Sequence, residues 1–269
     1  MASGHIHVGV GGWSFAPWRG VFYPNDLPHA RELDYASRHL TSIEINATFY
    51  RTQTPDIFSK WREATPSGFV FSVKAPRYAV TRPRLSDAIQ SIQRFFDSGV
   101  LALEEKLGPV LWQFPATRAY DPDFVKGFLS ALPSASGGRT IRHAIEARHD
   151  SFASPGFVAL ARAHQAAIVI AGDSDFPLIA DITAPFVYAR LMGTQARRRQ
   201  GYDCARLDLW AERARRWARG ADAEDLPHLA AHAPKTRARD VFLYVIRGAK
   251  VRNPAAAAAL IERLRAIQK

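Results

Sequence analysis

Short apolar segments of similar composition recur along the chain. They read HIHVGVGGW, SIEINATFY, GFVFSVKAP, GPVLWQFP, HAIEARHD, AAIVIAGDSD, PFVYARLMG and DVFLYVIRG. Each is rich in β-branched or aromatic residues and does not alternate strictly between apolar and polar positions, which is typical of a strand covered on both faces. The pattern therefore predicts eight buried strands.

Helical patterns lie between most of these segments. The segment PRLSDAIQSIQRFFDSG places its apolar side chains at helical spacing, at Leu85, Ala88, Ile89, Ile92 and Phe96. Near the end of the chain, Asn253 is expected to cap a helix whose first residue is Pro254. Strands that alternate with helices in this way predict a (β/α)8 barrel of the TIM type, an α/β fold, as a single domain over residues 1–269.

Two connections are expected to depart from the regular repeat. Between the sixth and seventh strands, FPLIADITAP is too short for a good helix, so the sixth helix should be degenerate. The seventh and eighth strands are joined by a long insertion that contains the basic run ARRRQ and the polar stretch GADAEDLPHLAAHAPKTRAR, which we expect to be mobile. An amphipathic helix is predicted between them, around Leu207, Trp210, Ala214 and Trp217.

Composition indicates a globular protein. Hydrophobic residues make up 47% of the chain and charged residues 23%, far from the signature of disorder. The one cysteine, Cys204, excludes an internal disulfide and a multi-cysteine zinc site. The first residues lack the order of a signal peptide, and no apolar run approaches the roughly 18 residues of a membrane span. We therefore expect a cytoplasmic protein that has no membrane partner.

The charge balance is the unusual global property. Lys and Arg number 36 and Asp and Glu number 25, so the net charge is 36 − 25 = +11. Such an excess suits anionic ligands such as phosphates or nucleic acid. It also fits arginines that merely solvate the surface, and both interpretations stay open.

Polar side chains collect where the predicted strands end. In a TIM-type barrel the active site lies at the carboxyl ends of the strands. Because side chains alternate along a strand, Glu44 and Asn46 share one face of the second strand, as Glu146 and Arg148 share one face of the fifth. The other strands end in Lys74, Gln113, Asp173, Tyr188, Arg190 and Arg247. The amino ends are mostly apolar, so this asymmetry predicts a site.

These residue types suggest acid–base chemistry on an anion. The carboxylates are candidate catalytic residues, since a desolvated carboxylate near cations can be tuned for proton transfer: Glu44, Glu146 and Asp173. Candidate substrate-binding residues are Asn46, Lys74, Gln113, Arg148, Tyr188 and Arg190. The alternative is that Glu44 and Glu146 form salt bridges with Lys74 and Arg148 that only close the barrel.

A metal site is a further possibility. Oxygen and imidazole ligands of the kind used by divalent-metal barrels come from four residues, Glu44, Glu146, His149 and Asp173. Nearby Lys74, Arg148 and Arg190 compete for the same carboxylates, and the four have no tight spacing motif. We therefore assign no metal ligand, and the sequence leaves any cofactor unknown.

An ordered set of motifs makes the chain similar to a known family. The motifs are GGWSFAPWRGVFYP, EINATFYRTQTP, FVFSVKAPRYAVT, LGPVLWQFP, AIEARHDSF, FVYARLMG and YDCARLDLWAERA. Together they resemble the YecE-like family, a TIM-barrel domain of unknown function. The resemblance implies a TIM-type barrel with a polar pocket at the carboxyl rim, and no settled activity.

The chain also departs from that family pattern. Arg82 and Met192 stand where the resemblance implies histidines, and the end of the eighth strand reads VIRGAKVRNP instead of an Asn-rich segment. Positive charge is therefore added at the rim by Arg82, Arg247, Lys250 and Arg252. The family's activity is expected to be altered or lost here.

We therefore expect an enzyme that acts on a small anionic substrate. The candidate reaction classes are hydrolase, lyase and isomerase. The substrate would be phosphorylated or carboxylated, and sugar-like compounds belong to this class. One alternative is a metal-dependent phosphodiesterase or isomerase. The other is a nucleic-acid-binding protein that uses the basic surface. The sequence makes no prediction of the oligomeric state.

Overall fold

The computed structural model describes residues 3–231 and 238–266. Within these ranges one sheet contains nine parallel strands. They are β1 (Ile6–Gly11), β2 (Ser42–Ile45), β3 (Val70–Lys74), β4 (Leu107–Phe114), β7 (His143–Ala147), β8 (Ala167–Ile168), β9 (Ile170–Gly172), β10 (Phe186–Leu191) and β11 (Asp240–Val245). A short antiparallel hairpin is formed by β5 (Ala135–Ser136) and β6 (Arg139–Thr140).

The strand order closes the sheet into a barrel. The order is β8-β7-β4-β3-β2-β1-β11-β10-β9, so β8 and β9 are the two ends of the sheet. Only Val169 separates β8 from β9 along the chain, and its N–H donates to the carbonyl of Ile145. The two segments are therefore halves of one sixth barrel strand, and the predicted eight-stranded TIM-type barrel is confirmed.

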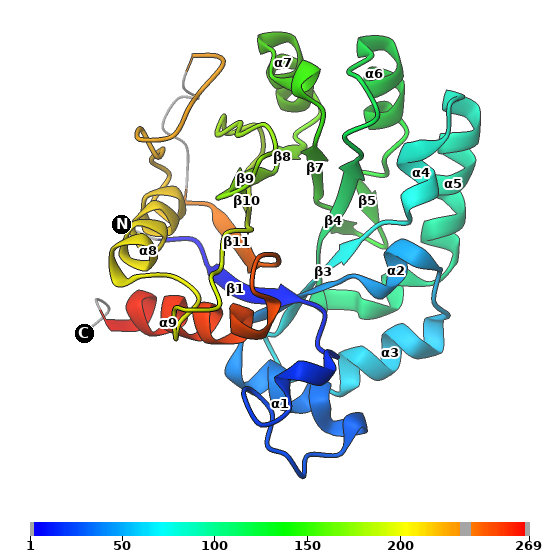
Figure 1. Cartoon of the computed structure of the whole chain (residues 1–269). Helices are drawn as coiled ribbons and strands as arrows, with labels where there is room; N and C mark the ends of the chain where they lie inside the picture. The colour runs from blue at the N-terminus through cyan, green and yellow to red at the C-terminus, as the bar shows by residue number, and fades with distance from the viewer. Residues whose placement is uncertain (1–2, 232–237, 267–269) are drawn as a thin grey trace.

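Helices surround the strands (Figure 1). The α-helices are α1 (Glu32–His39), α2 (Ala47–Tyr50), α3 (Pro55–Glu63), α4 (Arg77–Thr81), α5 (Leu85–Asp97), α6 (Pro122–Ser130), α7 (Pro155–Ala163), α8 (Cys204–Ala218) and α9 (Asn253–Ala266). Short 3-10 helices are η1 (Ala16–Trp18), η2 (His29–Arg31), η3 (Val100–Lys106), η4 (Asp150–Phe152) and η5 (Lys250–Arg252). Across the described residues, no helix is both long enough and apolar enough to span a bilayer.

Alternation along each strand separates an outer core from an inner one. Ile43 and Ile45 of β2 belong to the large cluster that packs under the helices. Ser42 and Glu44, which alternate with these isoleucines, are equally buried but point into the barrel. There the Ser42 hydroxyl lies 2.7 Å from the Tyr244 hydroxyl. A second apolar cluster fills the barrel interior, formed by Leu111, Ala144, Ala167, Val169, Phe186, Tyr188, Phe242 and Tyr244.

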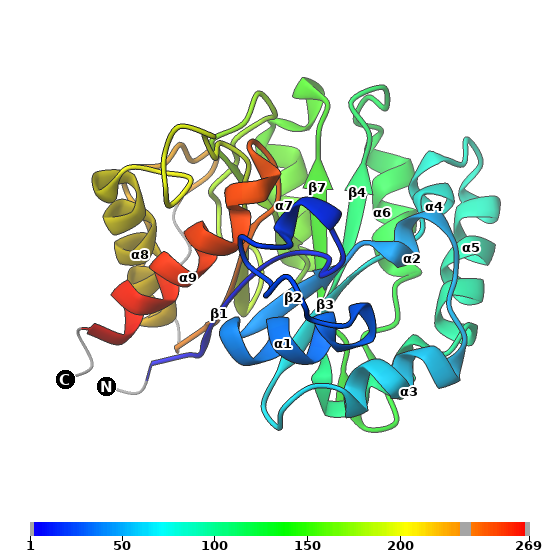
Figure 2. The ribbon, with the colours of Figure 1, turned by 60° about the horizontal axis from the view of Figure 1, so that its bottom comes forward.

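The barrel interior changes from apolar to charged along its axis. Ser72 lies one inward step below Lys74 on β3, and its hydroxyl meets that of Tyr188 at 2.7 Å. Above this hydroxyl layer, the last inward positions of the strands carry Glu44, Lys74, Gln113, Glu146 and Arg190, all buried. Figure 2 shows the strands from the side, with the β4 and β7 arrows rising toward the carboxyl end. The fold therefore brings charged residues far apart in sequence to one end of the barrel.

The two irregular connections differ in structure. Among the described residues no helix lies between Gly172 and Phe186, whereas α8 occupies the connection from β10 to β11. The α8 helix forms as predicted, and the four residues that defined its apolar face are buried: Leu207, Trp210, Ala214 and Trp217. Part of the stretch expected to be mobile is anchored, because the N–H groups of Leu229 and Ala230 donate to Asp181 at 2.8 and 3.0 Å. Residues 232–237 of that stretch lie outside the described residues.

The expected cap of the last helix is wrong in detail. Asn253 has helical backbone angles, with φ −58° and ψ −44°, so α9 begins at this residue and follows η5 directly. Its buried carboxamide oxygen accepts a hydrogen bond from the Thr194 hydroxyl at 2.8 Å. Asn253 therefore ties α9 to the loop after β10 instead of capping the helix.

Candidate functional site

Arg190 joins two buried carboxylates at the carboxyl end of the barrel. From β10, its Nε and Nη2 donate to the two oxygens of Glu44 on β2, each at 3.0 Å. Its Nη1 donates to Oε2 of Glu146 on β7 at 2.6 Å. The two glutamates are fully buried and Arg190 is 3% exposed. The result is an ion triad that crosses the barrel, with the planar guanidinium matched to one carboxylate in bidentate fashion.

Two members of this triad, Glu146 and Arg190, are charged at neutral pH. Burial alone would raise the pKa of Glu146, but the nearby Arg190 and Arg148 guanidinium groups and the Gln113 amide outweigh it and lower the pKa. Burial also opposes the charge of Arg190, yet the two carboxylates raise its pKa. Glu146 is therefore a stable carboxylate at neutral pH, and a poor proton donor there.

Tyr188 and Gln113 hold the carboxylates in place. The Tyr188 hydroxyl donates to Oε2 of Glu44 at 2.7 Å, and the Gln113 amide donates to Oε2 of Glu146. Burial, aided by the nearby Glu44 carboxylate, raises the pKa of Tyr188 well above its ordinary value, so its phenol remains a proton-bearing donor. Both residues were predicted to bind substrate, and in the structure both donate to the carboxylates of the triad.

Arg148 combines one ion pair with unused donors. Its Nη2 donates to Oε1 of Glu146 at 3.3 Å, and its guanidinium lies 4.2 Å from the centre of the Phe176 ring. Its Nε is buried and has no hydrogen-bond partner among the described residues. Arg247 lies over the same ring at 5.7 Å, which places a second cation beside Arg148. Because a buried N–H without an acceptor is costly, this donor is a candidate for binding a ligand.

Lys74 is a buried cation without an ion-pair partner among the described residues. It is 8% exposed, and its Nζ lies 3.7 Å from the centre of the Phe49 ring. The salt bridge between Lys74 and Glu44, which the sequence left open as an alternative, is absent from the described contacts. Arg190 pairs with that carboxylate instead. Burial, together with the positive charge of Arg190, lowers the pKa of Lys74 to about 8, although Glu44 and Glu146 oppose the change.

The structure places Asn46 and Asp173 differently. Asn46 is half-buried at the end of β2, and its Nδ2 lies over Gly11, where an added Cβ would meet it at 2.7 Å. Asp173 follows β9 with a positive φ of 55°, and its Oδ2 accepts from Trp210 Nε1 at 2.9 Å. Its described ion pair, to Arg206 at 3.7 Å, also leads away from the triad. Asp173 lines a separate pocket of about 300 Å³.

The four residues considered as metal ligands do not converge. Arg190 bridges Glu44 and Glu146, whereas His149 Nδ1 pairs with the Ser151 hydroxyl at 2.8 Å in the loop after β7. In residues 3–231 and 238–266 no group of three or more His, Cys, Asp or Glu side chains is arranged to hold a metal ion. The metal-dependent alternative therefore gains no support from this geometry.

The positions that depart from the family pattern are spread over the rim. Arg82 is exposed and Met192 is buried. Lys250 lies 4.3 Å over the Phe15 ring, where burial lowers its pKa, and Arg252 Nε donates to the Ala196 carbonyl at 3.2 Å. Of the added cations, Arg247 shares the Phe176 ring with Arg148.

Sequence reasoning missed several residues that support the cluster. They are Ser42, Ser72, Tyr244 and Phe176. Ser42 and Ser72 precede Glu44 and Lys74 by two positions, so the alternation that placed the charges inward also placed these serines. Phe176 lies in an irregular loop, where no periodicity marks it.

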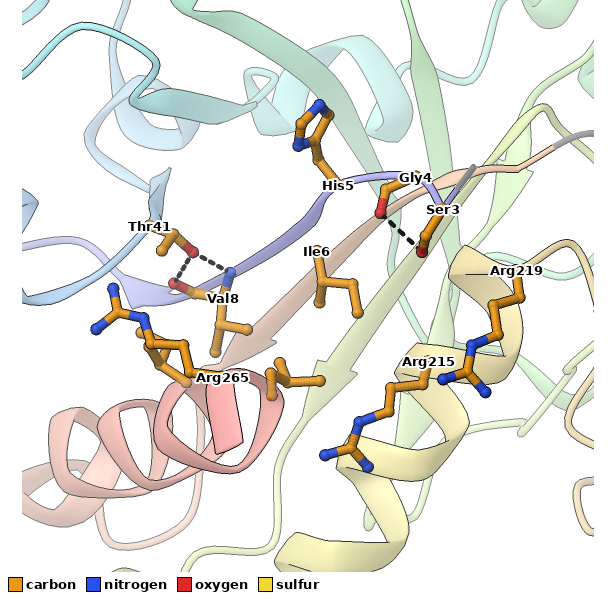
Figure 3. Close-up of a pocket in the computed structure, with 11 residues that line it drawn as sticks. Ser3, Gly4, His5, Ile6, Val8, Thr41, Arg215, Arg219 and Arg265 are labelled. Atoms are coloured by element: carbon orange, nitrogen blue, oxygen red, sulfur yellow. Dashed lines mark hydrogen bonds between the residues drawn. The ribbon is translucent and has the colours of Figure 1, made fainter. Parts of the chain in front are cut away.

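A pocket of about 650 Å³ lies at the opposite, amino end of the barrel. Figure 3 shows it beside the start of β1, with Arg215 extending from α8, Arg219 from the residue that follows α8, and Arg265 from α9. Arg215 and Arg265 lie in the last turns of their helices, where a positive charge complements the helix dipole. None of the predicted site residues lines this pocket, so it is distinct from the charged cluster.

The fold and the cluster define a parallel α/β barrel of the TIM type with a buried charged carboxyl end. The chain belongs to the family described as protein of unknown function DUF72, whose model matches residues 7–269. The family resemblance drawn from the motifs is therefore confirmed at this level. A curated relative, the UPF0759 protein YunF of Bacillus subtilis (strain 168), is 30% identical over 115 residues, which span 41% of this chain and only 40% of that protein.

Solved structures share the fold. A DUF72 family protein of Thermotoga maritima MSB8 has a TM-score of 0.75 at 20% identity, covering 98% of this chain and 100% of that one. A DUF72 family protein of Enterococcus faecalis V583 has a TM-score of 0.72 at 16% identity, covering 96% and 95%. A fusion protein of a xylose isomerase-like TIM barrel and 4-hydroxyphenylpyruvate dioxygenase has a TM-score of 0.52 at 14% identity, covering 99% of this chain and 44% of that one. These similarities establish the barrel and assign no activity.

Proposed function

We propose that this protein is an enzyme that binds a small anionic compound at the carboxyl end of its barrel. The enzyme would then add a proton to this compound or remove one from it. The supporting observation is that Lys74 and Arg148 bring unused N–H donors to a cluster whose carboxylates are already paired with Arg190. Donors that the protein itself leaves without acceptors favour an acceptor that comes from outside.

The charge of the cluster favours an anion. Lys74, Arg148 and Arg190 carry three positive charges and Glu44 and Glu146 two negative ones, so the cluster has a net charge of 3 − 2 = +1 when all are ionised. Arg247 adds a further cation at its edge. A carboxylate or phosphate group would balance this charge and accept a hydrogen bond from the unpartnered Nε of Arg148.

The geometry favours a particular division of roles. Lys74 titrates nearest to neutral pH, with a pKa of about 8, and is therefore the better candidate for moving a proton. Glu44 and Glu146 hold Arg190 and Arg148 in position, which makes them positioning residues. Asn46, half-buried at the end of β2, keeps its proposed role of orienting the substrate, and the catalytic role predicted for Asp173 would require it to leave Trp210.

A thermal-shift screen of purified protein tests the proposal. The panel contains small carboxylates, sugar phosphates, divalent metal salts and short DNA, applied to the wild type, Arg148→Ala and Lys126→Ala. The last variant removes a charge from the exposed face of α6 and serves as the control. At about 100 Kd a ligand of the native state adds roughly 2.7 kcal/mol of stability.

We expect a small anion to stabilise the wild type and Lys126→Ala, and Arg148→Ala to lose most of that shift. A small-anion shift that survives both Arg148→Ala and Lys74→Met would contradict the proposed site. A shift with DNA alone, and only at low salt, would instead favour the nucleic-acid-binding alternative.

A further inference from the structure

Two buried lysines in this protein have opposite surroundings. Lys106 is 6% exposed, and its Nζ donates three hydrogen bonds, to the Arg62 carbonyl at 2.7 Å and to the carbonyl and hydroxyl oxygens of Thr65 at 2.6 and 3.0 Å. Lys74 is 8% exposed and donates no hydrogen bond to a described residue. Three donors satisfied by the fold indicate a structural lysine, whereas three unsatisfied donors at the site end of a barrel indicate a reacting one.

The surroundings of Lys74 favour its neutral amine. Burial disfavours the ammonium most, and the Arg190 guanidinium is the charged group that lowers its pKa most, whereas the face of the Phe49 ring, 3.7 Å from Nζ, is a contact that favours the cation. Burial beside another cation is the arrangement that makes a lysine nucleophilic. With a pKa of about 8, roughly a tenth of Lys74 is neutral at pH 7, against less than a thousandth for an ordinary lysine.

The groups around Lys74 also suit a carbonyl compound that carries an acid group. Glu44 and Glu146 both interact electrostatically with its ammonium, so two carboxylates lie near the amine and stabilise positive charge on its nitrogen. Arg148 is held by Glu146 at 3.3 Å and retains an unpartnered Nε for the acid group of the ligand. An amine nucleophile, a carboxylate and an anion contact therefore share one end of the barrel.

We propose that Lys74 captures the carbonyl carbon of a small anionic aldehyde or ketone, such as a 2-oxo acid or a phosphorylated sugar, as a covalent imine. This inference rests on the proposed function and specifies its substrate class. The neutral amine forms a C–N bond to the carbonyl carbon, and one of its two protons passes to the carbonyl oxygen. The resulting carbinolamine loses its hydroxyl together with the second nitrogen proton as water and leaves a C=N bond, so that amine and carbonyl become imine and water without a change of oxidation state.

Reductive trapping tests the imine. The full chain is incubated with glyoxylate, pyruvate or dihydroxyacetone phosphate and cyanoborohydride, and the modified lysines are mapped by mass spectrometry. We expect one adduct per chain, at Lys74, formed at least tenfold faster than at the exposed Lys126. Lys74→Met should lose this adduct while Lys126→Met keeps it, and Lys74→Arg, which retains the charge, provides a second variant if the methionine variant misfolds.

Its pH dependence provides an independent readout. Because the reacting species is the neutral amine, trapping at Lys74 should rise from pH 6 and level off above pH 8, whereas trapping at an ordinary lysine continues to rise toward pH 10. Arg148→Ala should slow trapping of pyruvate about tenfold or more and leave trapping of propanal, which lacks an acid group, nearly unchanged.

Two outcomes separate this inference from the proposed function. If Lys74 reacts no faster than Lys126, the imine is wrong. If small anions still stabilise the protein in an Arg148-dependent way in that case, the anion-binding function stands without the covalent step. If neither trapping nor anion binding depends on Lys74 or Arg148, both proposals fail.

Discussion

Arg190 is shared by the two buried carboxylates at the carboxyl end of the barrel. It donates to Glu44 from two nitrogens at 3.0 Å and to Glu146 at 2.6 Å, and all three groups are almost completely removed from water. A buried ion pair is weak evidence for stability, since desolvation costs about as much as the attraction returns. The triad is better understood as a fixed electrostatic frame, within which Lys74 and Arg148 keep donors for another molecule.

At the residue scale, Lys74 is expected to reduce stability at neutral pH. Its pKa in the folded protein is about 8, below the ordinary 10.5, so between these values this group binds more protons in the unfolded chain and its contribution to wild-type stability rises with pH. Below pH 8 the full cost of burying the ammonium is present. Lys74→Met should therefore increase the free energy of unfolding by about 2–3 kcal/mol at pH 7, with the gain shrinking between pH 8 and pH 10.5.

Urea denaturation of the wild type, Lys74→Met and the control Lys126→Met at pH 6, 7, 8, 9 and 10 measures this effect. A Lys74→Met protein that is less stable than the wild type at pH 7, or whose difference does not change with pH, would show that the ammonium is well solvated in the folded state.

At the element scale, β1 and β2 can lie side by side as they do because Gly9 has no side chain. Gly9 pairs with Ser42, and a Cβ at this position would lie 1.9 Å from the Ser42 carbonyl oxygen. Backbone atoms cannot move away without separating the two strands. Gly9→Ala should therefore lower the free energy of unfolding by about 3 kcal/mol or more, or prevent folding.

Gly156 provides the matched control for this substitution. It lies in the first turn of α7, where an added Cβ would meet only the Ser154 hydroxyl oxygen, at 4.0 Å. Gly156→Ala should be neutral or stabilising by about 0.5–1 kcal/mol. Chemical denaturation of the two variants compares them directly, and equal effects would mean that the close approach of β1 and β2 is not a constraint.

Much of this architecture follows from local sequence rules. Apolar runs predicted the strands, and alternation predicted that Glu44, Glu146 and Arg190 point inward at one end. The pairing of Arg190 with both carboxylates was not predictable, because it depends on how three strands distant in sequence meet across the closed barrel.

Asp173 shows a second limit of sequence reasoning. Its position at the end of the sixth strand predicted a place in the site, but a positive φ of 55° turns the chain there. The carboxylate meets Trp210 of α8 instead, at 2.9 Å. Tertiary contacts of this kind leave no local pattern in the sequence.

At the scale of the whole molecule, a net charge of +11 allows two kinds of anion binding. A nucleic acid bound to a diffuse basic surface loses affinity steeply as salt rises, because many counterions are released. One small anion held by buried donors is screened much less. The structure supports the second kind, since Lys74 is buried and the Nε of the partly exposed Arg148 is buried as well.

Calorimetric titration of inorganic phosphate into the wild type, Arg148→Ala and Arg219→Ala, at low and at physiological salt, tests the central claim most directly. Arg219 lines the pocket at the amino end of the barrel and is the matched arginine control. We predict binding that changes little with salt, that weakens about 10- to 100-fold in Arg148→Ala through loss of a charge-assisted hydrogen bond, and that is unaffected in Arg219→Ala. Affinity that depends on Arg219 but not on Arg148, or no phosphate binding by the wild type, would contradict an anion site at the carboxyl end of the barrel.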